Sequence, residues 1–201
     1  PDGVDLEVGG TVEDQGDAFG DLGVLFILIV ILVYIVMATQ FESLLFPFII
    51  MFTIPFAFTG VFLALWMTST PLSLIALIGA IMLVGIVTKN GIVMVDYMNL
   101  LIERGSGVFD AVIAGGKSRL RPVLMTSFTT ILGMLPLAIG TGAGSETWQP
   151  MGIAVIGGLT FSTILTLFIV PVLYSILVNR SQRKEREKLA RLSAEHQASK
   201  H

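Results

Sequence analysis

Lys89 is the residue of this chain whose position most requires a chemical explanation. It lies about midway along a largely apolar run from Leu72 to Ile102, with Thr88 and Asn90 on either side. If this run crosses a bilayer, a lysine at that depth costs about 2.5–3.5 kcal/mol on translocon scales. Such a charge is tolerated where another group compensates it, so Lys89 predicts a partner.

Three roles for Lys89 remain open from the residues alone. The ammonium could reach an interface along its aliphatic stem, form a structural pair with a carboxylate from another segment, or take part in an ion or proton relay. Lys89 lies more than about three helical turns from either end of the run, which argues against the first role. We favour the relay, which is the default hypothesis for an intramembrane ionisable residue.

The carboxylates of the chain offer Lys89 no well-placed partner. Only Asp96 shares its run, and in a helix Asp96 lies on nearly the same face about 10 Å further along the axis. We expect Asp96 near the inner interface, close to Tyr97 and Asn99. All other acidic residues lie outside the apolar runs or at their ends. The partner of Lys89 is therefore expected from outside these 201 residues.

A cluster of hydroxyl residues follows the basic segment around Arg119: Thr126, Ser127, Thr129 and Thr130. Thr126 comes seven residues, or two turns, after Arg119, so both share one face if their helix begins before Pro122. Hydroxyls at this place can bind a buried ammonium or hold water. They can equally serve to pack helices together, which is common in membranes.

The composition indicates an all-α integral membrane protein. The chain is 54% hydrophobic and 13% charged, with a mean hydropathy of +0.85, whereas soluble domains are about 25% charged. Five apolar runs are close to the ~20 residues that a membrane-spanning helix needs. They cover residues 22–38, 45–67, 74–101, 122–139 and 151–178. Pro122 and Pro150 fit the first turns of the last two helices.

The basic residues predict the orientation. Of the 12 Lys and Arg, all but Lys89 lie between the third and fourth runs or after the fifth. The positive-inside rule puts those two segments in the cytoplasm. Residues 1–20 are then periplasmic, as the end of a soluble domain with a short strand at Val4–Val8, and residues 181–201 form a charged cytoplasmic tail that begins as a helix.

Two local features add expectations about packing. Val108, Ala111, Val112 and Gly115 recur at helical spacing, so a short interfacial helix is expected before the fourth run. Small residues within the runs indicate close helix contacts. They are Gly79, Gly85, Gly91, Gly133, Gly152, Gly157 and Gly158.

The sequence offers no sign of an enzyme. It has no cysteine, no phosphate-binding glycine loop followed by Lys-Ser or Lys-Thr, no evident nucleophile–base pair and no metal-ligand spacing. We therefore expect no cofactor and no metal. We interpret the basic cluster near Arg119 as a determinant of membrane orientation and a contact for lipid headgroups. Nucleic acid is not an expected partner.

Five motifs, in this order, resemble one family of transporters. They are Phe41-Glu-Ser43, Val84-Gly-Ile-Val-Thr-Lys-Asn-Gly-Ile-Val93, Arg119-Leu-Arg-Pro-Val-Leu-Met-Thr-Ser127, Thr141-Gly-Ala-Gly144 and Phe168-Ile-Val-Pro-Val172. The chain resembles the C-terminal transmembrane half of the resistance-nodulation-division (RND) inner-membrane efflux pumps, in the branch that exports drugs and amphiphiles. The resemblance covers roughly residues 4–180.

The resemblance implies that the five runs are the eighth to twelfth helices of a twelve-helix protomer. Lys89, with Asn90 beside it, Thr126 and Arg119 would form one side of a proton relay, and two aspartates on the absent fourth helix would form the other. It further implies proton/substrate antiport driven by the proton motive force, a homotrimer, a periplasmic adaptor and an outer-membrane channel. The heavy-metal branch is expected to lack this lysine, so Lys89 favours the drug branch.

Two other functions stay open at this point. The chain could belong to a non-transporting membrane scaffold or receptor that keeps the RND fold, or to a protein-translocation accessory of the same superfamily. The accessory is expected to carry other motifs in the third run. Two carboxylates at membrane depth facing Lys89 would favour the pump, and apolar residues at those places would favour the scaffold.

Overall fold

Six helices form the described part of the chain, and it contains no strand. The computed structural model describes residues 11–140, 142 and 144–198. The helices are α1 (Thr11–Phe41), α2 (Leu45–Met51), α3 (Ile54–Met67), α4 (Leu74–Glu103), α5 (Val108–Ile139) and α6 (Ser145–Ala198). The predicted all-α class is confirmed, and the strand predicted at Val4–Val8 lies outside the described residues. Five segments are long and apolar enough to cross a membrane, as predicted.

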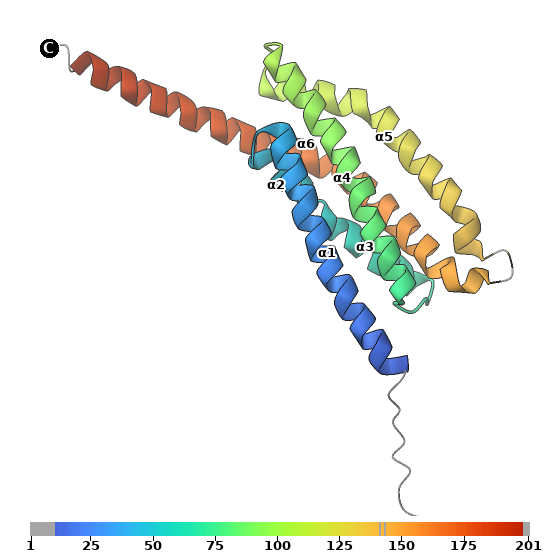
Figure 1. Ribbon diagram of the computed structural model, residues 1–201. Helices are drawn as coiled ribbons and strands as arrows, with labels where there is room; N and C mark the ends of the chain where they lie inside the picture. The colour runs from blue at the N-terminus through green and yellow to red at the C-terminus, as the bar shows by residue number, and fades with distance from the viewer. Residues whose placement is uncertain (1–10, 141, 143, 199–201) are drawn as a thin grey trace, which may run out of the picture.

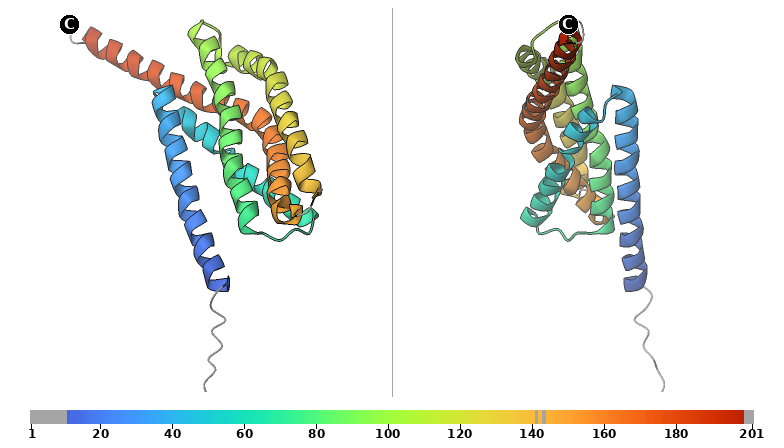
Figure 2. Two further views of the ribbon diagram at one scale, coloured as in Figure 1. Left: turned by 45° about the vertical axis from the view of Figure 1, so that its right-hand side comes forward. Right: turned by 90° about the vertical axis from the view of Figure 1, so that its left-hand side faces the viewer.

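α6 is the central helix of the bundle. It packs against α3, α4 and α5, while α4 lies between α1 and α5 and contacts both (Figures 1 and 2). α1 contacts α4 and α2 and leaves most of its surface exposed. The last part of α6 projects beyond the bundle (Figure 1), so the predicted helical extension into the tail is confirmed for the backbone.

The predicted second span is two helices. α2 ends at Met51 and α3 begins at Ile54, with Phe52 and Thr53 forming a turn between them. Pro55, in the first turn of α3, has no N–H to continue the ladder of α2. The Ile50 carbonyl accepts both the Thr53 hydroxyl at 2.6 Å and the Thr53 backbone N–H at 3.0 Å, so the turn satisfies the end of α2. The predicted span over residues 45–67 is confirmed, and this turn divides its helix into two.

The two prolines expected in first helical turns lie further inside their helices. α5 runs without interruption through Pro122, so the separate interfacial helix predicted before it is the beginning of α5. Pro122 removes one hydrogen bond to the carbonyl of Ser118, and both residues are exposed, so another donor can reach that carbonyl. Pro150 comes after α6 has already begun at Ser145, and its missing bond would have ended in the first turn.

The buried residues form two apolar clusters along the bundle. One contains Val61, Leu83, Val87 and Leu159, with their buried neighbours. The other contains Met37, Ile50, Met94, Val170 and Tyr174, with theirs. Both clusters draw on α4 and α6, which places these two helices at the centre of the fold.

Close glycine contacts bring the helices together. A methyl group built on any of five predicted positions meets another helix at or below van der Waals distance: Gly79, Gly91, Gly152, Gly157 and Gly158. These five predictions are confirmed. Gly85 and Gly133 have no other atom within 4 Å of such a methyl, so close packing was wrongly expected there among the described residues.

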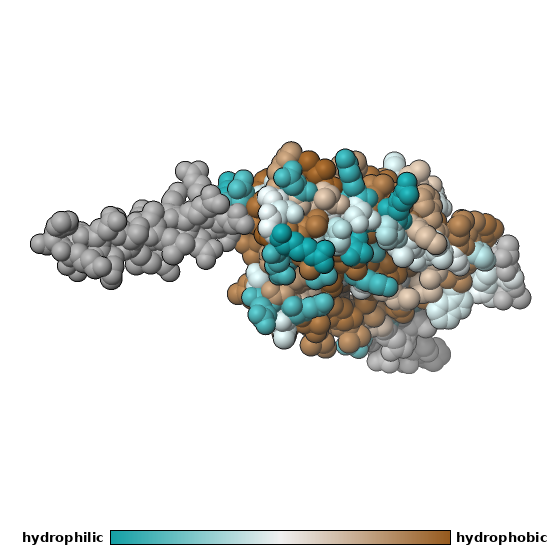
Figure 3. All heavy atoms as spheres, turned by 90° about the horizontal axis from the view of Figure 1, so that it is seen from above, coloured by the Kyte–Doolittle hydropathy of each residue, from teal (hydrophilic) through white to brown (hydrophobic). Residues whose placement is uncertain are grey.

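Hydrophilic residues gather at one end of the bundle. Figure 3 looks onto the end where α4 finishes and α5 begins, and the polar surface there contrasts with the hydrophobic flanks. Arg104 and the basic residues at the start of α5 belong to this end. This is the pattern that the positive-inside argument uses.

Candidate functional site

Lys89 lies in an apolar groove between α1 and α4. The groove has a volume of about 350 Å³. Its lining residues are Leu32, Val33, Val36 and Met37 from α1, and Gly85, Thr88, Lys89, Ile92 and Val93 from α4. Lys89 is the only charged residue in this lining, and no described carboxylate belongs to it. The groove thus surrounds an exposed ammonium-bearing side chain with hydrocarbon.

The helical period of α4 explains why Lys89 lies there. The residues of α4 that face the bundle include Val84, Val87, Thr88 and Gly91, all buried. Lys89 follows this face by one residue, about 100° around the helix, and is exposed. The Thr88 hydroxyl donates to the Val84 carbonyl at 2.6 Å and keeps its capacity to accept. Asn90 is half-buried on the other side.

Asp96 does not reach Lys89. α4 continues without a break from Leu74 to Glu103, so the two residues are separated by nearly two turns, about 10 Å along the axis. Asp96 is exposed and is not part of the groove lining. The expectation that these two residues form no direct pair within one straight helix fits this geometry.

Arg119 makes a contact that the sequence did not reveal. Its guanidinium carbon lies 4.6 Å from the centre of the Tyr97 ring, a cation–π contact between α5 and α4. The Arg119 Nε is buried and has no hydrogen-bond partner among the described residues. The sequence contains only a weak signal for this contact. Tyr97 lies near the end of one apolar run and Arg119 lies before the next, and neither position specifies that the two residues meet.

The hydroxyls of α5 divide into two kinds. Ser127 is buried and hydrogen-bonds to Thr163 of α6 at 2.9 Å, so its role in packing helices is confirmed. Thr126 is exposed, and its hydroxyl donates to the Val123 carbonyl at 2.9 Å. Because α5 begins well before Pro122, Arg119 and Thr126 lie on one continuous helix, two turns apart. A contact between Thr126 and Lys89 remains a prediction.

Tyr174 ties three helices together at the second apolar cluster. Its hydroxyl donates to the Asn99 side-chain oxygen, and its ring stacks on Phe46 with centroids 5.7 Å apart and planes at 18°. The side chain is fully buried. Sequence reasoning missed this link between α2, α4 and α6, although a tyrosine within an apolar run needs a partner for its hydroxyl.

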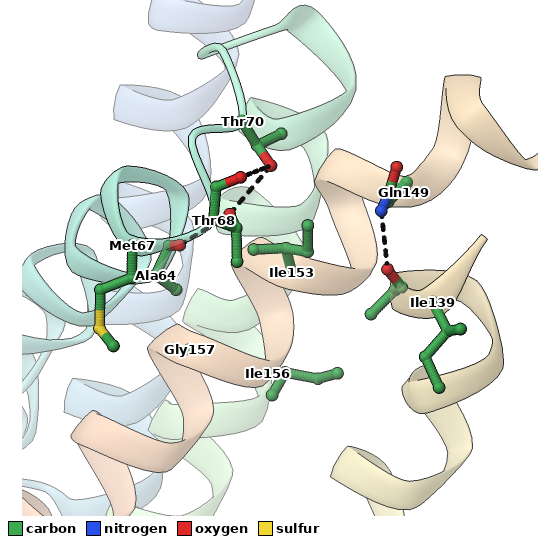
Figure 4. Close-up of a pocket in the computed structure, with 10 residues that line it drawn as sticks. Ala64, Met67, Thr68, Thr70, Ile139, Gln149, Ile153, Ile156 and Gly157 are labelled. Carbon is green, nitrogen blue, oxygen red and sulfur yellow. Dashed lines mark hydrogen bonds between the residues drawn. The ribbon is translucent and has the colours of Figure 1, made fainter.

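A second cavity opens near the turn between α3 and α4 and has a volume of about 390 Å³ (Figure 4). Thr68, Thr70 and Gln149 are its polar residues, and the rest of its lining is apolar. Gln149 donates to the Ala138 carbonyl at 3.1 Å, and the two threonine hydroxyls lie 2.9 Å apart. This cavity is the larger of the two, but no titratable side chain lines it. The Lys89 groove is therefore the better candidate for charge-driven chemistry.

Five segments of membrane-spanning length and apolar composition define a multi-pass helical membrane protein, with a lysine midway along one of its helices. The chain belongs to the AcrB/AcrD/AcrF family, whose sequence model matches residues 1–178. The RND resemblance predicted from the motifs is thus confirmed.

Relatives of several kinds match most of the chain. It is 39% identical over 185 residues to the swarming motility protein SwrC of Bacillus subtilis and 38% identical to the cobalt-zinc-cadmium resistance protein CzcA of Cupriavidus metallidurans; each match covers 92% of this chain. It is 44% identical over 155 residues, 77% of the chain, to the multidrug resistance protein MdtC of Erwinia amylovora. These matches cover 18%, 17% and 15% of the three relatives, so the chain spans less than a fifth of their length.

Solved structures agree with this assignment. A crystal structure of a heavy metal efflux pump superposes with a TM-score of 0.77 at 32% sequence identity. The match covers 85% of this chain and 17% of that pump. The fold of the described helices is therefore that of part of an RND membrane domain.

Proposed function

We propose that this chain is the lysine-bearing part of the membrane domain of a proton-driven efflux transporter. The observation that carries the proposal is the Lys89 groove, an apolar recess with one cation and no carboxylate in its described lining. A cation at this depth needs a compensating group. In the family arrangement, two aspartates on a helix outside this chain would enter the groove and supply it.

The groove gives the relay a simple physical basis. Proton entry from the periplasm neutralises an aspartate opposite Lys89 and removes its attraction for the ammonium. A change of one charge in this environment is worth several kcal/mol, enough to bias a membrane domain between two helix packings. Asn90 and Thr126 would hydrogen-bond the ammonium or the water around it in one of these states.

In this proposal Arg119 links the movement of α4 to that of α5. It stacks on Tyr97, which lies eight residues after Lys89 on the same helix. A movement of α4 that follows protonation would therefore be transmitted to α5 through this contact. The periplasmic part of the transporter would then cycle through its states and export the substrate.

We assign the substrate to drugs or amphiphiles. Support comes from the 43–44% identity to two proteins named multidrug resistance protein MdtC, above the 38% identity to CzcA, and from the family expectation for Lys89. By the same proposal the protein lies in the bacterial inner membrane, with residues 1–20 periplasmic and the tail cytoplasmic. It would act as a homotrimer with a periplasmic adaptor and an outer-membrane channel.

The decisive experiment compares Lys89→Ala with Lys117→Ala in the full-length protein, expressed at matched levels in a strain without its own pumps. Lys117 is exposed at the basic end of α5, so its substitution removes the same charge outside the membrane core. Lys89→Ala is expected to lower drug resistance to that of the empty vector, while Lys117→Ala keeps it. Wild-type efflux by Lys89→Ala would refute the proposal.

Two further readouts separate the alternatives. Growth in cobalt, zinc or cadmium salts instead of drugs tests the metal-exporting branch with the same strains. The coding sequence upstream of residue 1 tests the scaffold: acidic residues at membrane depth facing Lys89 favour the transporter, and apolar residues there favour a protein that only keeps the fold.

A further inference from the structure

A layer of hydroxyl groups crosses the bundle core between the two apolar clusters. We call it the hydroxyl layer, and it consists of Thr88, Ser127, Ser162, Thr163 and Thr166, all buried. On α6 the layer lies between Leu159 of the first cluster and Val170 of the second. On α4 it lies between Val87 and Met94, so it has the same depth as Lys89.

Two members of the layer stand out because their hydroxyls have no partner. Ser162 is 1% exposed and Thr166 is 2% exposed. Neither hydroxyl oxygen has a hydrogen bond to any described residue. The two residues are one turn apart on α6, about 6 Å along its axis, and so lie on one face.

Most other threonine hydroxyls in the helices hydrogen-bond to a backbone carbonyl of the preceding turn. Seven threonines donate to the carbonyl four residues earlier, at 2.6–3.0 Å: Thr39, Thr59, Thr68, Thr88, Thr129, Thr130 and Thr160. Ser127 and Thr163, the neighbours in the layer, bond to each other. Back-bonding is the ordinary solution for a hydroxyl in a helix, and Ser162 and Thr166 depart from it.

The two hydroxyls are closed off from lipid, and no described residue bonds to them. α3, α4 and α5 of this same chain pack against α6 and leave both side chains almost inaccessible. A buried hydroxyl without a hydrogen bond is costly in an apolar surrounding. What reaches it here must be small, neutral and able both to donate and to accept. Water has these properties and typically bridges two to four buried polar groups.

We propose that Ser162 and Thr166 hold a buried water molecule in the hydroxyl layer. The two hydroxyls supply two of its hydrogen bonds from one face of α6. The site brings water to the depth of Lys89 on the inner side of α4, opposite the groove that the ammonium faces. It depends on the packing of this chain alone, so it stands whether or not the protein transports drugs.

The direct test is a cryo-electron microscopy map of the full-length protein in lipid nanodiscs, at a resolution that shows ordered water. The expected result is density within about 2.7–3.2 Å of both hydroxyl oxygens. A dry site, with both hydroxyls turned onto the carbonyls of the preceding turn, would overturn the proposal.

A double-mutant cycle tests the same site by energy. Ser162→Ala, Thr166→Val and the double variant are compared for reversible unfolding of the full-length protein in bilayers. Because one water serves both hydroxyls, the double variant is expected to be at least about fivefold less destabilised than the product of the single effects predicts. Effects that simply multiply would overturn the proposal. Thr160→Val is the control, since this exposed, back-bonded residue should show no coupling to Ser162→Ala.

Discussion

Gly157→Ala tests how closely α3 and α6 must approach. A methyl group on Gly157 would overlap the side chain of Ala64 and lie 3.0 Å from the Gly60 carbonyl oxygen. The contact is equally close at Gly60 of α3, where a methyl group would lie 2.8 Å from the Gly157 carbonyl oxygen. The two helices must therefore separate to admit one carbon atom.

The magnitude follows from two opposing effects. Carbon atoms pack at about 3.5–4.0 Å, and forcing a methyl group into a filled helix contact costs about 1–3 kcal/mol. Replacing glycine by alanine within a helix gains about 1 kcal/mol. Gly133→Ala on α5 keeps the gain without the overlap, because no other atom lies within 4 Å. The difference between the two variants isolates the packing cost and corresponds to about a 5- to 150-fold difference in the unfolding equilibrium constant.

The assay is reversible unfolding of the full-length protein in bilayers, with both variants measured against the wild type. Gly133→Ala is expected to be at least as stable as the wild type, and Gly157→Ala less stable. If Gly157→Ala matched Gly133→Ala, the inferred contact between α3 and α6 would be refuted.

Two further predictions concern the second apolar cluster and the orientation. Tyr174→Phe leaves the Asn99 side-chain oxygen without its donor and should lower the free energy of unfolding by about 0.5–1.5 kcal/mol in the same assay. Tyr34→Phe, which removes an exposed hydrogen bond, should change it little, and equal effects would contradict the role assigned to the part-buried Tyr174–Asn99 bond. These 201 residues contain no cysteine, so Ser106→Cys and Glu146→Cys can be labelled singly with a membrane-impermeant maleimide once any cysteine elsewhere in the full-length protein is replaced. Only Glu146→Cys should react from the periplasm, and the reverse pattern would invert the topology.

Hydropathy and charge were sufficient to predict the five spans and the lack of a well-placed carboxylate for Lys89 among the described residues. Both depend on quantities that add along the sequence, such as apolar length and the location of basic residues. For the groove itself, the sequence indicated only that no carboxylate of this chain would lie beside Lys89. That its other wall is α1 is a tertiary fact, since no pattern in residues 22–38 indicates which helix they face.

The prolines and glycines show where such reasoning fails. Pro55 lies in the first turn of α3, just after a break in the helix, whereas α5 continues through Pro122, although both prolines lie in or beside apolar runs. The carbonyl that Pro122 leaves without its donor belongs to Ser118, which is exposed, and that exposure follows from the tertiary packing and not from the apolar length of the run. Likewise Gly85 and Gly91 share α4, yet only Gly91 contacts another helix, because their directions around the axis differ.

The length of α6 has a mechanical consequence. This one helix contains 54 residues, about 81 Å at 1.5 Å per residue, whereas the hydrocarbon core is about 30 Å thick. Its backbone continues 18 residues beyond the membrane-length segment that ends at Arg180, or about 27 Å. A tilt of about 10° within the bundle displaces the end of a rigid extension of this length by about 5 Å. α6 therefore acts as a lever arm, and a label near residue 198 would report small helix movements within the bundle as larger displacements at the end of the helix.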